Sequence, residues 1–334
     1  MALPVVSILM PVFNAGSTLP ACVRSIRRQT ETRWECIVVN DGSSDSTLAC
    51  ARRWAETDGR VLVLDTPHRG IVDALNTGLE RCRGTFVARM DADDLMHRHR
   101  LAAQIAALER SSWAAAGCRV RLFPRTVLTP RRRAYEGWLN SLESPARVRA
   151  DAFVECPIAH PALMIRTDIL KTFGYRDQGW PEDYDLVLRL LAAGFEIGIV
   201  PRRLLCWRDG ATRLSRTHPM YALDRFTACK AAFLATGLLV GTDEYVLWGY
   251  GQTGRALRRA LLRHRKRPAC IVEVHRGRLG NSIHGVPVIA PAALSNLRGQ
   301  RIVASVAGGG PRAQIRAALH AVGFEESQDF VCAA

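Results

Sequence analysis

The run Met90-Asp91-Ala92-Asp93-Asp94 contains the side chains of this sequence that are best suited to chemistry. Three carboxylates so close together, directly after an apolar segment, repel one another strongly unless a cation is present. A divalent ion bound to them and to a diphosphate would neutralise both partners. The Asp-x-Asp spacing also lets Asp91 and Asp93 point the same way if strand geometry continues through the run. The run therefore predicts a divalent-cation site.

Two other interpretations apply to an isolated acidic run. An EF-hand calcium loop would need glycine and glutamate where the chain has Met96 and Ala102, so that interpretation fails. A solvated acidic turn is common, because most acidic side chains lie on protein surfaces. For the run taken alone, the solvated turn is the more frequent outcome. The choice depends on where the fold places the run.

Two more acidic segments are candidates for binding or catalysis. Asp41 opens a Gly-Ser-Ser-Asp turn, where its carboxylate can accept hydrogen bonds from a nucleobase N–H; the alternative is a plain turn that caps the next helix. Glu182-Asp183-Tyr184-Asp185 begins a predicted helix, and acids at this end favour the helix dipole. Three acids exceed what capping needs, which makes one of them a candidate general base. His160 and His218 are further candidates in the same region.

Strands and helices alternate through the first third of the chain. Apolar runs typical of buried strands cover residues 5–10, 36–39, 61–64 and 85–90, and helical periodicity follows each of the first three. This alternation predicts parallel βαβ units and an open sheet covered on both faces. Ligands of such sheets gather beyond the carboxyl ends of the strands, where Asp41 and Asp91 fall. After Gly117 the pattern becomes irregular until a strong helix from about 182 to 193.

A second α/β pattern starts after a short linker. The strand 246–248 leads into Gly249-x-Gly251-x-x-Gly254 and a helix, and Glu273 ends the next strand. That context predicts a dinucleotide or nucleotide site, with a Rossmann-like fold that binds nothing as the alternative. We expect three segments: a catalytic domain at 1–236, a linker at 237–243 and a Rossmann-like domain at 244–334.

The composition favours anionic partners. The chain of 334 residues has a formal net charge of +15, carried almost wholly by arginine. No recognised nucleic-acid-binding module is visible, so we expect no nucleic-acid partner. The ten cysteines are scattered and predict buried apolar residues rather than disulfides. With neither a secretory signal nor a membrane-spanning run, we expect a cytoplasmic protein, with a candidate peripheral contact to the inner membrane face through arginines of the helix 254–264.

Taken together, the motifs from about Val5 to Ser215 resemble glycosyltransferase family two, whose inverting members have the GT-A fold. The opening strand and nucleotide loop of the family resemble Val6 to Asn14, which includes Pro11, Val12 and Phe13. The second signature resembles Val39 to Thr47, the metal motif resembles Met90 to Asp94, and Glu182 to Leu186 resembles the segment with the catalytic base. Leu75 departs from the pattern, because many members have arginine there.

The resemblance implies roles for individual residues. It implies a mostly parallel sheet with helices on both faces, and transfer of a sugar from a nucleotide-diphosphate donor, with a UDP-sugar favoured, to a glycan or lipid-linked acceptor. Asp183 would be the general base, and Asp93, helped by Asp91, would hold Mn²⁺ or Mg²⁺. The donor would contact a set of residues from three motifs: Pro11, Val12, Phe13, Asn14, Asp41, Asp91, Ala92 and Asp93. Glu182, His160 and Arg208 are candidates for acceptor binding or support.

The carboxyl-terminal pattern has a resemblance of its own. From Val246 onward the chain is similar to the nucleotide-sugar-binding domain of bacterial sugar acyltransferases, which implies a second nucleotide site with Gly249, Gly251, Gly254 and Glu273. Alternatives to the transferase are a non-catalytic nucleotide-sugar-binding or regulatory protein, a nucleotidyltransferase, and a nicotinamide-dependent oxidoreductase that would rest on this second domain alone.

Overall fold

The computed structural model describes residues 3–210 and 213–334. The chain forms two compact units that are described separately. The first unit contains Met1–Val148, Ile158–Gln178 and Arg189–Arg213; the second contains Arg149–Pro157, Gly179–Leu188 and Leu214–Ala334. Two helices, α6 (Pro145–Ala150) and α8 (Glu182–Ala192), contribute residues to both units.

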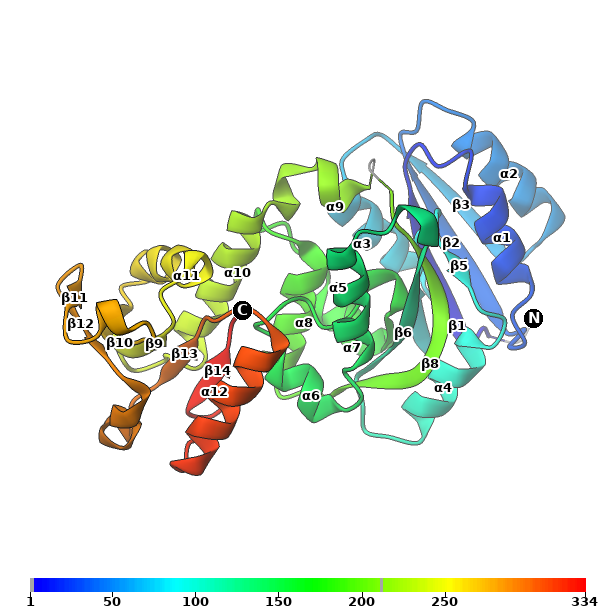
Figure 1. The fold of residues 1–334 in the computed structure, drawn as a ribbon. Coiled ribbons are helices and arrows are strands. Elements are labelled where there is room, and N and C mark those ends of the chain that lie inside the picture. The colour runs from blue at the N-terminus through cyan, green and yellow to red at the C-terminus, as the bar shows by residue number, and fades with distance from the viewer. Residues whose placement is uncertain (1–2, 211–212) are drawn as a thin grey trace. The chain divides into compact units, whose positions relative to one another are not determined.

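The first unit is built on one eight-stranded sheet in the order β3-β2-β1-β4-β7-β6-β8-β5 (Figure 1). The strands β1 to β4 are parallel to one another, whereas β7 runs antiparallel to both β4 and β6. The strand bounds are β1 Val6–Val12, β2 Trp34–Asp41, β3 Val61–Thr66, β4 Phe86–Arg89, β5 Leu95–Met96, β6 Ala115–Phe123, β7 Met164–Arg166 and β8 Ile197–Arg208.

Helices cover both faces of this sheet. The alternating side chains of β1 show the two faces: Cys22 of α1 contacts Met10, while Gly78 of α3 packs against Leu9. Both β1 and β2 are buried almost along their whole length, as expected for strands with helices on each side. The helices are α1 Leu19–Arg27, α2 Thr47–Thr57, α3 Ile71–Arg81, α4 Arg100–Glu109, α5 Pro130–Asn140 and α7 Thr167–Phe173, with short 3-10 turns at Arg125–Val127 and His160–Ala162.

The second unit contains a six-stranded sheet in the order β11-β12-β10-β9-β13-β14. All neighbouring strands are parallel except the β11–β12 pair. The bounds are α9 Leu214–Thr217, α10 Leu223–Thr236, β9 Glu244–Trp248, α11 Gln252–Leu262, β10 Arg267–Val272, β11 Ser282–Ile283, β12 Val286–Ile289, β13 Ile302–Ala304, α12 Gly309–Ala321 and β14 Phe330–Cys332, with 3-10 turns at Pro219–Tyr221, Arg276–Arg278 and Pro291–Leu297.

Alternation along β9 again divides the core into two halves. Tyr245 and Leu247 belong to one buried cluster with residues of α10 and α11, while Val246 and Trp248 belong to another with residues of α12. The predicted mostly parallel α/β sheet with helices on both faces is confirmed, and a second, smaller unit has a sheet of its own.

The structure differs from the sequence-based expectation in two places. The segment after Gly117, expected to be irregular, is part of the regular strand β6, in which Arg119 and Arg121 alternate with the buried Val120 and Leu122 as in a half-buried strand. The helix α10, expected to close the first domain, packs Ala231 and Leu234 against the second sheet, because its apolar face has a partner there. The domain boundaries at 236 and 244 stay predictions.

The cysteines and the arginine-rich helix behave as structural elements. None of the ten cysteines, all of which lie within the described residues, forms a disulfide, and eight of them are buried. Leu257 and Leu261 of α11 lie in the core of the second unit, so this helix exposes its arginine-bearing side and keeps most of its apolar side inside. A membrane contact through α11 stays a prediction. Across residues 3–210 and 213–334, none of the helices has the length and apolar character that crossing a bilayer requires.

The contact between α3 and β1 gives a test of the packing. A Cβ placed on Gly78 would lie 2.4 Å from Leu9 Cδ1 and 2.8 Å from Val39 Cγ2, and both side chains are fully buried. We expect Gly78→Val to lower the free energy of unfolding by about 1–3 kcal/mol, because overpacking forces the core apart. Gly59→Ala is the matched control, since no atom lies within 4 Å of its added Cβ. Chemical denaturation measures both, and equal stability of the two variants would contradict this packing.

Candidate active site

The acidic run lies at the carboxyl end of β4. The strand stops at Arg89, and residues 91–94 form a turn in which the Asp94 N–H donates to the Asp91 carbonyl at 3.3 Å. Strand geometry therefore does not continue through the run. The turn nevertheless gathers the three side chains, because one oxygen from each of Asp91, Asp93 and Asp94 lies within 4.8 Å of the others. The result is a compact set of hard oxygen ligands.

Arginines and main-chain groups surround this cluster. Arg89 forms an ion pair with Asp91. Arg208, at the end of β8, donates its backbone N–H to Asp94 Oδ1 at 2.6 Å and its Nε to the Asp93 carbonyl at 2.8 Å. Asp94 is fully buried, and its Oδ2 has no hydrogen-bond partner among the described residues. The cluster is thus fixed by the ends of β4 and β8, with one buried oxygen left for a further ligand.

The three carboxylates differ in their electrostatic surroundings. Burial acts to raise the pKa of Asp91, but the guanidinium of Arg89 and the charge of Arg213 outweigh it and lower that pKa. Burial, followed by repulsion from Asp91, raises the pKa of Asp93. Burial also raises the pKa of Asp94 well above its usual value, and the other two carboxylates add to the shift. A divalent cation bound to the cluster would offset the burial and mutual repulsion that raise the pKa of Asp93 and Asp94.

A buried arginine supports the turn from below. Arg100, fully buried on α4, donates Nη2 to the Arg89 carbonyl at 3.0 Å and to the Leu163 carbonyl at 3.3 Å. Its Nε donates to Gln104 Oε1 at 2.9 Å, and Gln104 in turn donates to the carbonyls of Ala116 and Ala162. Burial lowers the pKa of Arg100. This network ties the end of β4 to β6 and to the segment before β7.

Two loops at neighbouring strand ends are joined by hydrogen bonds. Asn14, which follows β1 with φ of 48°, accepts from the Ser44 N–H at 2.9 Å and donates its own N–H to Ser43 Oγ at 3.0 Å. Gly16 N–H donates to Asp45 Oδ2 at 2.9 Å. The loop after β1 and the loop after β2 therefore form one surface. Pro11 and Val12 end β1 beneath it.

Asp41 is held by the loop that follows β3. Its carboxylate accepts the N–H of Arg69 at 2.8 Å and of Gly70 at 3.0 Å, and it pairs with His68 Nδ1 at 2.8 Å. The ring of His68 stacks on Phe13, with 4.3 Å between the ring centroids. The carboxylate is buried, with 4% of Asp41 exposed, so its first role is to order this loop. Sequence reasoning missed His68 and Arg69, because their role depends on the close approach of β2 and β3.

His160 lies in the first unit near Asp91. Its Nε2 is 3.0 Å from the Tyr175 hydroxyl, and its charge acts on the pKa of Asp91. Asn76 fixes Tyr175 through two hydrogen bonds to its main chain, at 2.9 and 3.0 Å. Leu75, where the family pattern often has arginine, is fully buried. His160 and Arg208 thus lie at the acidic cluster, as do Arg89 and Arg213, which sequence reasoning did not identify. Arg89 had a signal, because it precedes Asp91 by two residues on a strand.

Asp183 and Glu182 are in the second unit, at the start of α8. Glu182 is buried and accepts a hydrogen bond from the Tyr221 hydroxyl at 2.6 Å. Asp185 is buried and accepts from Trp180 Nε1 at 3.0 Å. Asp183 is partly exposed, and its Oδ1 accepts from the Tyr184 N–H at 2.7 Å. Of these three acids, Asp183 is the one that solvent reaches. His218 caps the 3-10 turn Pro219–Tyr221.

The glycine motif lies at a reversal of strand order in the second sheet. The chain moves from β9 to β10 on one side and later adds β13 on the other, and such switch points are where α/β sheets bind ligands. A Cβ on Gly249 or Gly254 would clash with backbone or side-chain atoms at 2.4 or 2.1 Å, whereas one on Gly251 meets nothing within 4 Å. Ser305, at the end of β13, is 2% exposed, and its Oγ has no partner among the described residues. Glu273 is paired with Arg278 at 2.9 Å.

An α/β sheet with carboxylates and polar loops at the carboxyl ends of its strands has the arrangement in which such sheets bind ligands. The sequence profile of "Glycosyl transferase family 2" matches residues 7–174. The chain therefore belongs to glycosyl transferase family 2, and it is a glycosyltransferase. The amylovoran biosynthesis glycosyltransferase AmsE of Erwinia amylovora is 28% identical over 248 residues, which cover 72% of this chain and 91% of AmsE.

Solved structures show the same fold. The chain of S. aureus TarS (residues 1–349), crystallised with UDP-GlcNAc, superposes with a TM-score of 0.55 at 16% identity, covering 78% of this chain and 72% of TarS. The mannosyltransferase PcManGT of Pyrobaculum calidifontis, in complex with GDP-Man and Mn²⁺, gives a TM-score of 0.51 at 21% identity, covering 70% and 63%. These similarities establish the GT-A fold.

The buried carboxylate of Asp94 predicts a pH dependence. Its folded-state pKa lies above the unfolded value of about 4, so its effect on stability is favourable below that pH and is lost as pH rises through the folded pKa. In EDTA, we expect Asp94→Asn to melt at least about 2 °C higher than the wild type at pH 7.5, with a smaller gap at pH 5. A Tm gap that does not grow with pH would contradict the charge assignment.

Proposed function

We propose that this glycosyltransferase moves a sugar from a nucleotide-diphosphate donor, with a UDP-sugar favoured, to a hydroxyl of a glycan or lipid-linked acceptor, with inversion at the anomeric carbon. The observation that carries the proposal is the gathering of Asp91, Asp93 and Asp94 at the end of β4, in the sheet whose β1, β2 and β3 loops are joined around Asp41. The donor would lie on these loops, with contacts to Pro11, Val12, Phe13, Asn14, Asp41, Asp91, Ala92 and Asp93.

The acidic cluster suits a divalent metal such as Mn²⁺ or Mg²⁺. Hard oxygen ligands are what these ions prefer, and one carboxylate oxygen from each of Asp91, Asp93 and Asp94 lies within 4.8 Å of the others. Asp93 would be the main ligand and Asp91 its helper, with Arg89 orienting Asp91. When bound, the metal would offset charge on the departing nucleoside diphosphate. Arg208 would hold the turn in place through its bonds to Asp93 and Asp94.

Asp183 is the proposed general base. Its support is the family resemblance and its position as the partly exposed acid at the start of α8. The carboxylate would take the proton of the acceptor hydroxyl as that oxygen bonds to the anomeric carbon and the bond to the diphosphate oxygen breaks. Glu182, fixed by Tyr221, would support the helix start, and His160 would support the donor side.

We also propose a separate nucleotide-binding role for residues 244–334, which 237–243 would join to a catalytic region at 1–236. The support is the switch point between β9 and β13, where Gly251 leaves open space and the buried Ser305 hydroxyl has no described partner. Gly249 and Gly254 would shape the turn, as their close contacts indicate. Because Glu273 is already paired with Arg278, it would orient that arginine, whose Nη1 also reaches the Tyr250 carbonyl at 3.4 Å.

A comparison of Asp93→Asn with Asp183→Asn tests the transferase proposal. We expect UDP- or GDP-sugars to raise the Tm of the wild type in Mn²⁺ or Mg²⁺, and Asp93→Asn to lose this metal-dependent rise because it lacks the main ligand. Asp183→Asn should keep the rise but lose roughly 10²–10⁴ in transfer rate, measured as nucleoside diphosphate released. Asp224→Asn is the control, because Asp224 is an exposed acid in the same unit as Asp183.

Each outcome separates the proposal from its alternatives. Pyrophosphate release from a nucleotide triphosphate and a sugar phosphate would identify a nucleotidyltransferase. Metal-dependent binding with no turnover for any donor would indicate a regulatory protein. Near-normal turnover by Asp183→Asn would remove that residue as the base.

The second site is tested in EDTA, where metal-dependent donor binding is absent. Calorimetric titration with UDP-sugars and NAD⁺ should show binding that Gly251→Val weakens at least about tenfold, because a side chain there occupies the open space at the loop. Asp93→Asn should bind as the wild type does. If no nucleotide binds, or if Gly251→Val binds equally well, residues 244–334 have no such site.

A further inference from the structure

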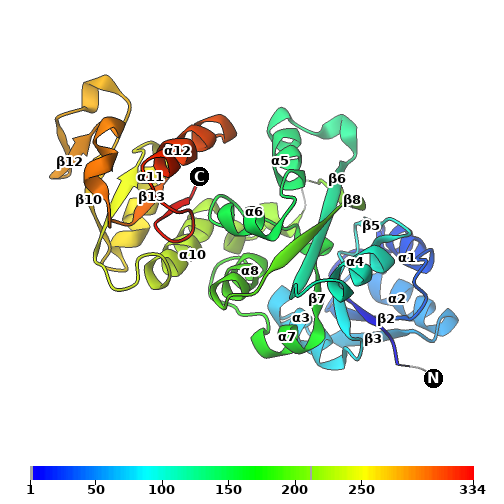
Figure 2. The same cartoon turned by 90° about the horizontal axis from the view of Figure 1, so that it is seen from below.

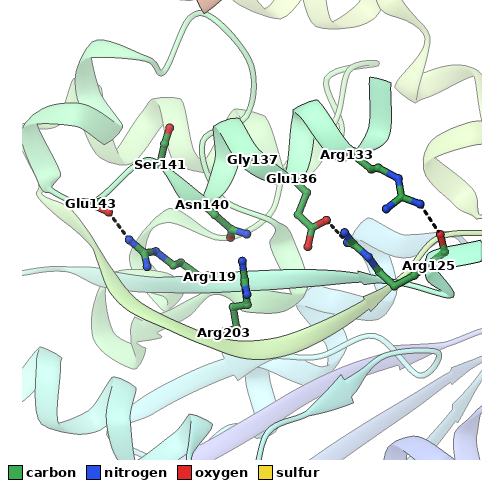
Figure 3. A pocket seen from close by; sticks show the side chains of 9 residues that line it. All are labelled: Arg119, Arg125, Arg133, Glu136, Gly137, Asn140, Ser141, Glu143 and Arg203. Atoms are coloured by element: carbon green, nitrogen blue, oxygen red, sulfur yellow. Dashed lines mark hydrogen bonds and ion pairs between the residues drawn. The ribbon is translucent and has the colours of Figure 1, made fainter. Parts of the chain in front are cut away.

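An arginine-lined pocket lies in the first unit, away from the acidic cluster. It has a volume of about 490 Å³, and its walls come from β6, β8, α5 and the segment after α5 (Figure 3). Four of its lining residues are arginines, at positions 119, 125, 133 and 203, and two are glutamates, at positions 136 and 143. Figure 2 shows α5 beside β6, the strand with which it packs. The volume is typical of small-molecule sites.

The strand pairing brings two of these arginines face to face. Arg119 of β6 pairs in register with Arg203 of β8, and the register shifts on both sides of Arg119. Like charges directly opposite one another destabilise a sheet, so this arrangement has a cost unless an anion offsets it. Bulges of this kind often redirect side chains at functional sites. In Figure 3 the side chain of Arg203 extends toward α5, and that of Arg119 extends toward Glu143 in the segment after α5.

The two glutamates do not neutralise the pocket. Glu143 forms an ion pair with Arg119, and Glu136 forms one with Arg125 while it also accepts the Leu122 N–H at 3.3 Å. Arg133 donates to the neutral carbonyl of Arg125 at 2.9 Å. Neither Arg133 nor Arg203 has a carboxylate partner among the described residues, and the buried Nε of Arg119 has no acceptor there. The pocket thus has an excess of two positive charges.

We propose that this pocket binds a phosphate or diphosphate group. Two uncompensated guanidinium groups match the charge of a phosphate dianion, and the planar fork of arginine suits bidentate contacts to phosphate oxygens. The pocket is much larger than one phosphate, so the group would belong to a larger molecule or to a diphosphate. Arg203 precedes Arg208 by five residues on β8, or roughly 15 Å along a strand, so this site is distinct from the acidic cluster.

The anion has two chemical sources, a soluble phosphate compound and a phospholipid headgroup. We expect pyrophosphate, titrated by calorimetry in EDTA, to bind the wild type, and Arg203→Ala to weaken that binding at least about tenfold. Arg203→Glu should abolish it, and Arg203→Lys should keep part of it. Arg202→Ala is the matched control, since Arg202 is the exposed neighbour that does not line the pocket. Flotation with phosphatidylcholine vesicles that contain phosphatidic acid tests the lipid source with the same variants.

The results define the site or remove it. Loss of pyrophosphate binding in Arg203→Ala, with donor-induced stabilisation in Mn²⁺ unchanged, supports a soluble phosphate ligand. Loss of vesicle binding in the same variant supports a lipid headgroup. If the wild type binds neither probe, or if Arg203→Ala and Arg202→Ala behave alike, the proposal is wrong, whatever the outcome for sugar transfer.

Discussion

Repulsion among three carboxylates is the constraint around which the first unit is arranged. Asp91, Asp93 and Asp94 share one turn, where burial and mutual repulsion raise the pKa of Asp93 and Asp94. The fold holds it with one main-chain and one side-chain hydrogen bond from Arg208 and with the fully buried Arg100, which fixes the carbonyl at the end of β4. Burying a guanidinium costs free energy of folding. The position of Arg100 beneath the turn therefore indicates that this residue serves to fix the geometry of the acidic cluster more than to stabilise the fold locally.

The sheet places the parts of the site by topology. Parallel strands put the loops after β1, β2 and β3 on one edge, and hydrogen bonds between Asn14 and Ser44 and between Asp41 and Gly70 then join loops that are distant in sequence. The carboxylate of Asp41 orders the neighbouring loop and can still accept a further hydrogen bond. The site is therefore a property of the strand order as much as of individual motifs.

Most of the α/β framework could be predicted from apolar periodicity and turn residues, because buried parallel strands such as β2 are nearly continuous apolar runs. The strand β6 was not predicted, although Arg119 and Arg121 alternate with apolar residues as in a half-buried strand, and α10 could not be assigned because periodicity does not reveal which sheet a helix covers. At the site, short motifs identified Asp41 and Asp93. The contributions of His68 and Arg213 arise from packing between segments separated by many residues, which a single sequence does not encode as a pattern.

The glycines of the β9 loop are of two kinds. Gly249 and Gly254 are required by the fold, since any side chain there would collide with neighbouring atoms, and the positive φ of Gly249 adds a second reason. Gly251 has no such requirement: its φ of −75° suits any residue, and open space surrounds it. Glycine at such a position leaves the unfolded chain more conformational freedom, a loss of about 0.4–1 kcal/mol of stability relative to alanine. The second unit is therefore less stable than it could be at Gly251, the one glycine of the motif that packing does not require.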